Sequence, residues 1–463
     1  MSSLAVCATP SIGRDDIRLP AALSDELRIK IMEAARVLYN VLGYAALPFL
    51  PARLWLRGRR EPGYRSRIGE RFGRYTTAAV GAPLVWLHAV SVGETRAALP
   101  LVQRLSASYP AATILLTHMT ATGRETGRAL FGERVTQAWL PYDLPFAVDG
   151  FLSHFRPAVG FLLETELWPN LIAKAHHAGI PLFLINARLS EPSARAYARF
   201  PALARPMLGR LAGIAAQSAA DAGRLASLGA AEPVVTGNLK FDVRVPDATL
   251  SLASEFKHRF GSRPLWVAAS TREGEEALIV DALARFSMPK NSLLIIVPRH
   301  PQRFEAVADL LRARGIPFAR RTENRAVTAD LRVVLGDSMG EMLAYYAASD
   351  LAFVGGSLLP LGGQNMIEPL AVGTPVVIGP HTFNFSDAAQ GAVSAGAARR
   401  VGNADELLAE VARLLSNPIE LATMRDRARS FHAAHRGAAD RLWRWLEPRL
   451  AATLGAPILP DRG

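Results

Sequence analysis

The sequence predicts an α/β fold that consists of two doubly wound, parallel-sheet domains. The chain has 463 residues, more than one hydrophobic core usually fills, so two domains are expected. Half of the residues are hydrophobic and a fifth are charged, which suits buried parallel sheets covered by helices on both faces. Short apolar runs also alternate with helical patterns along most of the chain, as they do in repeated strand–helix units.

The charge balance and the cysteine content restrict the classes of partner and site. There are 53 Lys and Arg residues against 41 Asp and Glu residues, a formal charge of +12. This excess favours phosphates, an anionic membrane surface, nucleic acid or an acidic substrate as the partner. The single cysteine, Cys7, excludes an intramolecular disulfide framework and fits a reducing compartment. No Cys/His cluster has the spacing of a zinc site, so we expect no metal site.

The N-terminal part of the chain differs in character from the rest. Residues 1–30 are polar and irregular and are expected to form a disordered extension, with Met32 as a second candidate for the start of translation. The run 37–50 is apolar except for Asn40, but it is shorter than the roughly 20 residues that a membrane-spanning helix needs. It also lacks the small-residue cleavage site of a signal peptide.

A basic segment follows this apolar run. Residues 51–75 contain eight arginines and two glutamates, with apolar and aromatic residues between them. An apolar anchor followed by such a segment is typical of an element that lies on the cytoplasmic side of a membrane, and we expect this of residues 31–75. The alternative is a solvated basic arm on a soluble enzyme. Nucleic acid is disfavoured, because the other basic residues are dispersed and no recognition motif accompanies them.

The first α/β domain is expected at 76–244. Its buried strands are expected at 84–90, 113–117, 135–140, 158–163, 181–185 and 234–236. Glu94 lies at a strand-to-helix junction, where α/β enzymes place catalytic groups, although a glutamate there can simply complement the helix dipole. Glu164 and Glu166 follow one strand end, and strand alternation would point them to opposite sides. Lys240 follows the last strand, and several polar clusters at one sheet edge predict a pocket for an anionic ligand.

The second α/β domain is expected at 245–424, after a proline-containing linker at 245–247. Strands expected at 265–268, 293–297, 331–335, 352–354 and 375–378 have polar loops at their ends. These loops supply hydroxyls, backbone amides, arginine and carboxylates, which together suit a nucleotide. The loop after 352–354 contains two glycine pairs, which alone could be ordinary turns. The last segment, 425–463, is expected to be a helix and tail that crosses back to brace the first domain with Trp443 and Trp445.

A series of short motifs recurs in order from about Tyr39 to the C-terminus. They are RIGERFG (67–73), HAVSVGE (88–94), LPYDLP (140–145), ETELWPN (164–170), NARLS (186–190), GNLKFD (237–242), STREGEE (270–276), VPRHP (297–301), GDSMGE (336–341), FVGGSL (353–358), GGQNMIEP (362–369) and GPHTFNF (379–385). Each motif alone is weakly specific. Together and in this spacing they resemble the 3-deoxy-D-manno-octulosonic acid (Kdo) transferase family of lipopolysaccharide biosynthesis.

The resemblance implies a fold, an activity and a location. The fold would be of the GT-B type, with two doubly wound Rossmann-like domains facing a central cleft and an N-terminal membrane-associated helix. The activity would be inverting transfer of Kdo from CMP-Kdo to the lipid A precursor (lipid IVA) in inner-core biosynthesis. The enzyme would act at the cytoplasmic side of the cell inner membrane, next to its anionic lipid surface. It would use no cofactor or bound metal and would bind no nucleic acid.

The resemblance also implies the site residues. Glu94 would be the general base, while Glu164 and Lys240 would stabilise the transition state. The CMP-binding residues would be Pro298, Arg299, Met339, Gly340, Glu341, Asn365, Met366, Ile367 and Glu368. This division is physically reasonable, because inversion needs a base opposite the leaving group and the departing CMP anion needs positive charge and backbone amides.

Two positions depart from the family pattern, and two rival functions remain. Gln364 and Arg272 stand where histidine is common, and we assign no catalysis to position 364 because glutamine carries no titratable proton. A sugar-nucleotide epimerase or another glycosyltransferase could share the architecture. The membrane-associated segment argues against an epimerase, whose substrates are soluble. A membrane-bound protein that only binds nucleotide sugars or nucleic acid is the non-enzymatic rival.

Overall fold

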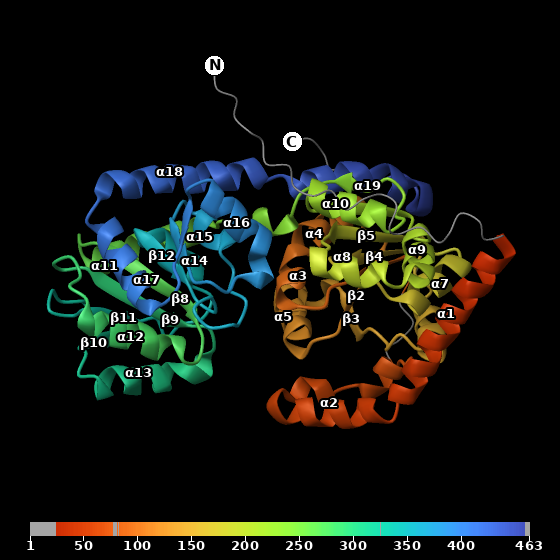
Figure 1. The fold of residues 1–463 in the computed structure, drawn as a ribbon, viewed down its shortest axis with the longest axis horizontal. Helices are drawn as coiled ribbons and strands as arrows, with labels where there is room; N and C mark the ends of the chain where they lie inside the picture. Colours follow the sequence, from red (N-terminus) through yellow and green to blue (C-terminus); the bar gives the residue numbers. More distant parts are fainter. Residues whose placement is uncertain (1–24, 77–80, 82, 325, 459–463) are drawn as a thin grey trace, which may run out of the picture. The chain divides into compact units, whose positions relative to one another are not determined.

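The computed structural model describes residues 25–76, 81, 83–324 and 326–458 (Figure 1). The chain forms two compact units, namely unit 1 (Met1–Asp242 with Gly437–Gly463) and unit 2 (Val243–Arg436). Most of the predicted extension at 1–30 lies outside the described residues. Its last residues already belong to helix α1, which begins at Asp25.

Unit 1 is built on a seven-stranded sheet in which every pairing is parallel, in the order β3-β2-β1-β4-β5-β6-β7. The strands are β1 (Leu84–His88), β2 (Thr113–His118), β3 (Thr136–Trp139), β4 (Val159–Leu163), β5 (Leu182–Ala187), β6 (Gly213–Ala216) and β7 (Val234–Val235). The helices between them are α3 (Val92–Ala97), α4 (Leu99–Ser108), α5 (Ala121–Phe131), η3 (Gly132–Arg134), α6 (Pro145–Phe155), α7 (Pro169–His177), α8 (Glu191–Ala198), α9 (Pro201–Gly209) and α10 (Ala219–Ser227). The chain then enters η4 (Leu239–Phe241) and later returns as α19 (Ala438–Leu454).

The strands of unit 1 are buried on both faces. Trp86 belongs to one hydrophobic cluster, while its neighbours Val85 and Leu87 belong to a second. Because successive strand residues point to opposite faces, the two clusters are the two sides of the sheet. Leu442 and Trp443 of α19 lie in the second cluster, which confirms the predicted return of the terminal helix to the first domain.

The N-terminal part of unit 1 is helical. It consists of α1 (Asp25–Ala46), α2 (Phe49–Arg60), η1 (Pro62–Arg65) and η2 (Ile68–Phe72), and Figure 1 shows α1 and α2 at the edge of the unit. None of the helices within the described residues is both long enough and apolar enough to cross a bilayer.

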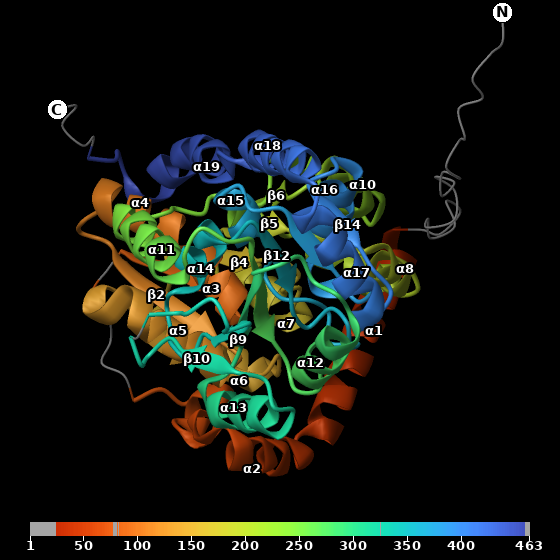
Figure 2. The same cartoon turned by 90° about the vertical axis from the view of Figure 1, so that its left-hand side faces the viewer.

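Unit 2 repeats the architecture with a second parallel sheet, in the order β10-β11-β9-β8-β12-β13-β14. Its strands are β8 (Leu265–Thr271), β9 (Leu293–Pro298), β10 (Phe318–Arg320), β11 (Val333–Leu335), β12 (Leu351–Val354), β13 (Val376–Ile378) and β14 (Ala398–Arg400). Its helices are α11 (Asp247–Phe260), α12 (Glu275–Arg285), η5 (Pro301–Arg303), α13 (Phe304–Ala313), α14 (Met342–Ala348), α15 (Ile367–Ala371), η6 (Phe383–Phe385), α16 (Ser386–Ser394), α17 (Ala404–Leu415) and α18 (Pro418–His435). Figure 2 shows the sheet between α11 and α14 on one side and α12 and α17 on the other.

Each sheet has one point where the strand order reverses. In unit 1 this point lies between β1 and β4, and in unit 2 it lies between β8 and β12. The loops at the carboxyl ends of such strands diverge and leave a crevice in which open α/β sheets bind ligands. The topology therefore confirms the predicted pair of doubly wound domains and marks one candidate site in each. The expected cleft between the domains stays a prediction.

Candidate active site

The site in unit 1 begins where β1 ends. Ser91 is the N-cap of α3, and its hydroxyl oxygen accepts a hydrogen bond from the Glu94 backbone N–H at 3.3 Å. The Glu94 carboxylate folds back over this turn. One oxygen accepts a hydrogen bond from the Val90 N–H at 2.8 Å, and the other accepts one from the Ser91 hydroxyl at 2.8 Å. The side chain of Glu94 is therefore held in one orientation, and the residue is only 8% exposed.

Glu164 lies at the neighbouring strand end. β4 ends at Leu163, and Glu164 adopts the left-handed backbone conformation with φ 60°. Such a conformation is uncommon for a residue other than glycine and is often found at functional sites. The carboxylate of Glu164 forms an ion pair of 2.6 Å with the Lys240 ammonium group.

Lys240 is positioned by the 3₁₀ turn η4. The Asn238 side chain accepts a hydrogen bond from the Lys240 N–H at 3.0 Å, and the buried Asn186 side chain accepts one from the Leu239 N–H at 2.9 Å. A Cβ atom added to Gly93 would lie 3.7 Å from Lys240 Cε, so the lysine lies against the first turn of α3. The structure thus brings the three predicted catalytic residues, Glu94, Glu164 and Lys240, into one cluster.

A third glutamate belongs to the same cluster. Glu166 accepts a hydrogen bond from the Trp168 indole N–H at 2.9 Å and lies 3.7 Å from Nε2 of the buried His88. Because β4 ends before both glutamates, strand alternation does not apply to Glu164 and Glu166, and both act electrostatically on Glu94. His88 is fully buried and its Nδ1 contacts the Thr117 hydroxyl at 2.9 Å, which fits a packing role for this histidine.

The surroundings of Glu94 change its acidity. Burial, followed by the negative charge of Glu164, raises the pKa of Glu94 to about 7, and the charge of Glu166 adds to the increase. The hydrogen bonds from Val90 and Ser91 oppose it. A carboxylate with a pKa near neutrality is a stronger base than an ordinary glutamate and is still partly ionised at neutral pH. The cluster is therefore equipped to remove a proton from a weak acid such as a hydroxyl group.

The site in unit 2 is organised by a buried carboxylate. Glu275, in the first turn of α12, is fully buried and accepts hydrogen bonds from the Gly356 N–H at 2.6 Å and the Leu358 N–H at 3.0 Å. This ties the loop after β12 to the loop after β8. A Cβ atom at Gly355 would come within 2.6 Å of the Ser270 carbonyl oxygen, so only glycine allows the two loops to approach this closely.

The glycine-rich loop then turns back on itself before α15. The Gly363 N–H donates to the Gly356 carbonyl at 2.7 Å, and the Asn365 side chain accepts a hydrogen bond from the Ile367 N–H at 3.0 Å. As whole residues, backbone included, Met366 and Ile367 are 1% and 0% exposed. These two predicted CMP contacts are therefore covered by neighbouring atoms in the structure, whereas Asn365 and Glu368 are half-buried and can present their side chains.

The remaining predicted CMP residues differ in accessibility. Pro298 closes β9 and is buried, and the next residue, Arg299, donates its backbone N–H to the Thr271 carbonyl at 3.0 Å. Glu341 forms an ion pair of 3.0 Å with Arg321. Met339 is 58% exposed, and the space beside Gly340, which has φ 81°, is open. The Met339–Gly340 turn and the Arg299 side chain are thus the accessible parts, and Pro298 is structural support.

Sequence reasoning did not assign a role to Glu275 or to Glu166. The sequence places Glu275 after Gly274 in a helical first turn, a pattern that is also typical of a glutamate that only complements the helix dipole. Its two N–H partners lie in a loop far along the chain, and no sequence signal joins them.

Comparisons with known proteins show the family to which the chain belongs. The family model described as 3-deoxy-D-manno-octulosonic-acid transferase (kdotransferase) matches residues 66–243. The 3-deoxy-D-manno-octulosonic acid transferase of Bordetella pertussis is 44% identical over 422 residues, which cover 88% of this chain and 97% of the relative. The enzyme of the same name from Haemophilus influenzae is 39% identical over 424 residues, covering 90% of this chain and 99% of the relative.

A solved structure supports the fold alone. HepE from Anabaena in complex with UDP superposes with a TM-score of 0.53 at 16% identity, covering 80% of this chain and 99% of that one. The two parallel-sheet α/β domains therefore resemble those of GT-B glycosyltransferases. With relatives this similar over nearly their full length, the chain belongs to the 3-deoxy-D-manno-octulosonic acid transferase family.

Proposed function

We propose that the protein is an inverting glycosyltransferase that moves Kdo from CMP-Kdo to a lipid A precursor in lipopolysaccharide biosynthesis. The observation that carries the proposal is the cluster of Glu94, Glu164 and Lys240 in a chain that belongs to the Kdo transferase family. The rival functions, an epimerase and a protein that only binds, are disfavoured, because the relatives matched over nearly their full length are transferases.

In the proposed reaction, Glu94 acts as the general base. Its carboxylate takes the proton of a sugar hydroxyl on the acceptor while that oxygen forms a bond to the anomeric carbon of Kdo. The bond from this carbon to the CMP phosphate oxygen breaks, and the electron pair leaves with CMP. Lys240, held by Glu164 at 2.6 Å, supplies positive charge next to the reacting groups.

Unit 2 is proposed to hold the donor nucleotide. Arg299 and the side-chain amide of Asn365, both half-buried, offer the positive charge and a hydrogen-bond donor that a nucleotide phosphate needs. The Met339–Gly340 turn offers an accessible backbone for the base or ribose, because no neighbouring atom fills the space beside Gly340. Glu275 does not contact the ligand in this scheme, and its role is to hold the glycine-rich loop in shape.

The direct test is a transfer assay. Purified protein is incubated with a tetraacylated lipid A precursor and freshly generated CMP-Kdo, and the lipid products are analysed by mass spectrometry. We expect Kdo-modified lipid and an equal amount of CMP. Absence of any Kdo-modified lipid, under conditions in which a known Kdo transferase forms it, would overturn the assignment.

We further propose that the protein works at the cytoplasmic side of the inner membrane, attached through α1 and α2. The orientation of α1 supports this. Two polar side chains in its second half face the protein: the Tyr39 hydroxyl donates to Asp143 at 3.0 Å, and Asn40 accepts from Asn170 at 2.7 Å. The apolar side chains Val37, Leu38, Val41 and Leu42 point outward and are between 56% and 62% exposed. A soluble helix normally has the opposite arrangement.

Helix α2 continues the same pattern. Phe49 is 71% exposed and Leu56 is 57% exposed, and the guanidinium of Arg59 lies 4.2 Å from the ring centroid of the half-exposed Trp55. Exposed apolar and aromatic residues with arginines between them are typical of a helix that lies in the membrane interface. The basic residues would then meet the anionic lipids of the cytoplasmic leaflet.

Vesicle flotation tests the attachment. The variant Leu38→Asn/Val41→Asn/Leu42→Asn should fail to float with phospholipid vesicles, while a control with three exposed apolar residues changed elsewhere, Leu250→Asn/Leu278→Asn/Ile419→Asn, should float like the unchanged protein. If the α1 variant floats as well as the control, α1 is not the attachment site.

A further inference from the structure

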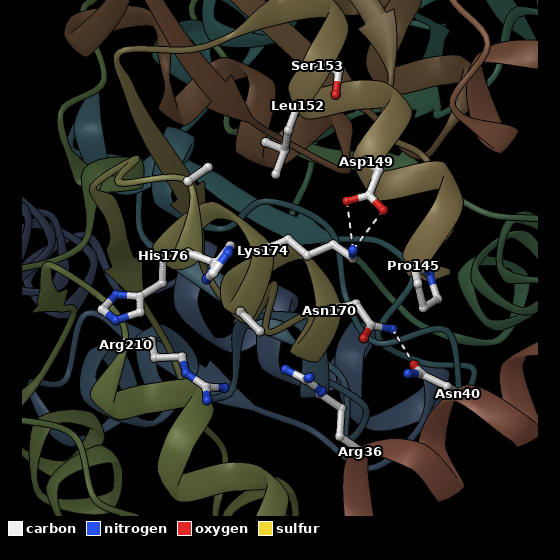
Figure 3. A pocket seen from close by; sticks show the side chains of 13 residues that line it. Arg36, Asn40, Pro145, Asp149, Leu152, Ser153, Asn170, Lys174, His176 and Arg210 are labelled. Atoms are coloured by element: carbon white, nitrogen blue, oxygen red, sulfur yellow. Dashed lines mark hydrogen bonds and ion pairs between the residues drawn. The ribbon is translucent and has the colours of Figure 1, made fainter. Parts of the chain in front are cut away.

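Unit 1 contains a cavity that does not belong to the carboxylate cluster. It has a volume of about 690 Å³ and lies among α1, α6, α7 and the end of α9 (Figure 3). Its polar lining includes Arg36 and Asn40 of α1, Asp149 of α6, Lys174 of α7, and Arg210, which follows α9. Neither Glu94 nor Glu164 nor Lys240 lines it, so it has no part in the chemistry proposed above.

The cavity has an excess of positive charge. Asp149 is the only carboxylate among the described residues that line it. It forms an ion pair with Lys174, whose ammonium group lies 2.7 Å and 2.8 Å from the two carboxylate oxygens. Within the described residues, neither Arg36 nor Arg210 has a carboxylate partner. Burial and the nearby positive charge of Arg36 lower the pKa of Arg210. The two guanidinium groups are therefore close enough to repel each other.

The unusual feature of this cavity is that two arginines, Arg36 and Arg210, point into it. His176 and His177 also line the cavity, but they end α7, where basic side chains complement the helix dipole. The arginines come from two different elements, and Figure 3 shows both side chains directed into the same space. Arg36 is exposed and Arg210 is half-buried, so a ligand can reach both. Guanidinium groups bind phosphate through paired hydrogen bonds, and a bound phosphate would remove the repulsion.

We propose that this cavity binds the phosphate of an anionic lipid headgroup. The position of α1 favours a lipid as the source, since Arg36 is on the inner side of the helix whose outer side carries Leu38, Val41 and Leu42. A helix is about 10 Å across, so a lipid surface in contact with that outer side is within reach of the cavity. Pro145 and Leu152 provide apolar wall for the glycerol carbons. This inference deepens the proposed membrane attachment and rests on it.

The test compares two variants of the full-length protein that lose the same charge. Arg36→Gln/Arg210→Gln removes the arginines of the cavity. Arg195→Gln/Arg199→Gln removes two exposed arginines, one in α8 and one immediately after it, and serves as the matched control. Binding is measured to vesicles of phosphatidylcholine alone and to vesicles that also contain phosphatidylglycerol. Circular dichroism of both variants checks that they are folded.

All three proteins should bind phosphatidylcholine vesicles equally, because that binding reports the apolar side of α1. The additional affinity for phosphatidylglycerol vesicles should fall roughly tenfold or more in the cavity variant, as expected for lost hydrogen bonds to a charged group, and change little in the control. Equal loss in both variants would mean general surface attraction, and no loss in either would mean that the cavity binds no lipid headgroup. Both results would overturn the proposal.

A titration with glycerol 3-phosphate distinguishes the two possible ligands, a lipid headgroup and a soluble phosphate ester. If the cavity recognises the phosphate group itself, this soluble ester should bind more weakly to the cavity variant than to the unchanged protein. If the ester distinguishes the variants and the vesicles do not, the site is real and its ligand is a soluble phosphate ester. If neither probe distinguishes them, the proposal is wrong. If no protein binds phosphatidylcholine, the membrane attachment fails, and the ester still decides whether the site exists.

Discussion

The carboxyl group of Glu94 combines close positioning with a raised pKa. Hydrogen bonds from the Val90 N–H and the Ser91 hydroxyl fix both of its oxygens, and such bonds alone would keep the group acidic. Burial and two neighbouring glutamates act in the opposite direction and dominate, so the pKa rises to about 7. The residue is thus fixed in place and can act as a base near neutral pH.

The raised pKa predicts the pH dependence of the reaction. Because the base must be ionised, kcat/KM should rise as the pH increases through about 7 and should fall below it, where Glu94 is protonated. Glu166→Gln removes a negative charge that raises the pKa of Glu94, so the rising limb of the pH profile of kcat/KM should move to lower pH. The surface variant Glu191→Gln is the control and should leave the limb in place. A limb that stays fixed or moves to higher pH in Glu166→Gln would contradict this electrostatic account.

The sequence could place Glu94 but could not give its acidity. Its position follows from an apolar run that ends in a helix start, which is a local pattern. The pKa depends on Glu164 and Glu166, which are brought close only because β4 pairs with β1 in the sheet. The accessibility of the CMP residues depends on tertiary packing in the same way, and this packing covers Met366 and Ile367.

At the scale of elements, the glycine-rich loop after β12 is shaped by a side chain from α12. The Glu275 carboxylate accepts hydrogen bonds from two N–H groups of the loop, one at each of its oxygens, and the residue has no exposed surface. A buried carboxyl group is costly unless it is hydrogen-bonded in this manner. The loop conformation, and with it the position of the proposed CMP contacts, therefore depends on the Glu275 side chain.

The variant Glu275→Gln tests this dependence. The amide has only one oxygen, so one of the two loop N–H groups would face an NH₂ donor in place of an acceptor. We expect a loss of about 1–3 kcal/mol in unfolding free energy, measured by denaturant titration, and weaker CMP binding by calorimetry. Glu273→Gln, two residues earlier and with a side chain that is 86% exposed, should behave like the unchanged protein. Indistinguishable behaviour of the two variants would show that Glu275 does not organise the loop.

Sequence analysis found the strands that are apolar runs, including the short β7, β11 and β13, and those it missed have identifiable reasons. β10 and β14 were not predicted, because each lies at a sheet edge and includes arginine. β6 was missed although it lies inside its sheet, since its sequence GIAA contains only one residue with strong strand preference. Pairing with neighbouring strands, and not local preference, makes these segments strands.

At the scale of the whole molecule, the chain leaves unit 1 and returns to it at one carboxylate. Asp242 accepts hydrogen bonds from the Gly437 N–H and the Ala439 N–H, both at 2.6 Å, where α19 begins. Sequence analysis placed the last boundary at 424/425, but α18 runs through that position. Met424 is buried in a core cluster of unit 2 and Arg425 pairs with Asp350 at 3.2 Å, so unit 2 extends to Arg436.

Unit 1 contains the proposed base and unit 2 the proposed nucleotide site, so one substitution can separate the chemical step from nucleotide binding. For Glu94→Gln and the unchanged protein, kcat for Kdo transfer and the Kd for CMP are measured on the same preparations. Removal of a general base should lower kcat by roughly 10²–10⁴-fold while the Kd for CMP stays the same. Turnover close to that of the unchanged protein, or a loss of CMP affinity that parallels the loss of turnover, would contradict the central claim that Glu94 takes the proton.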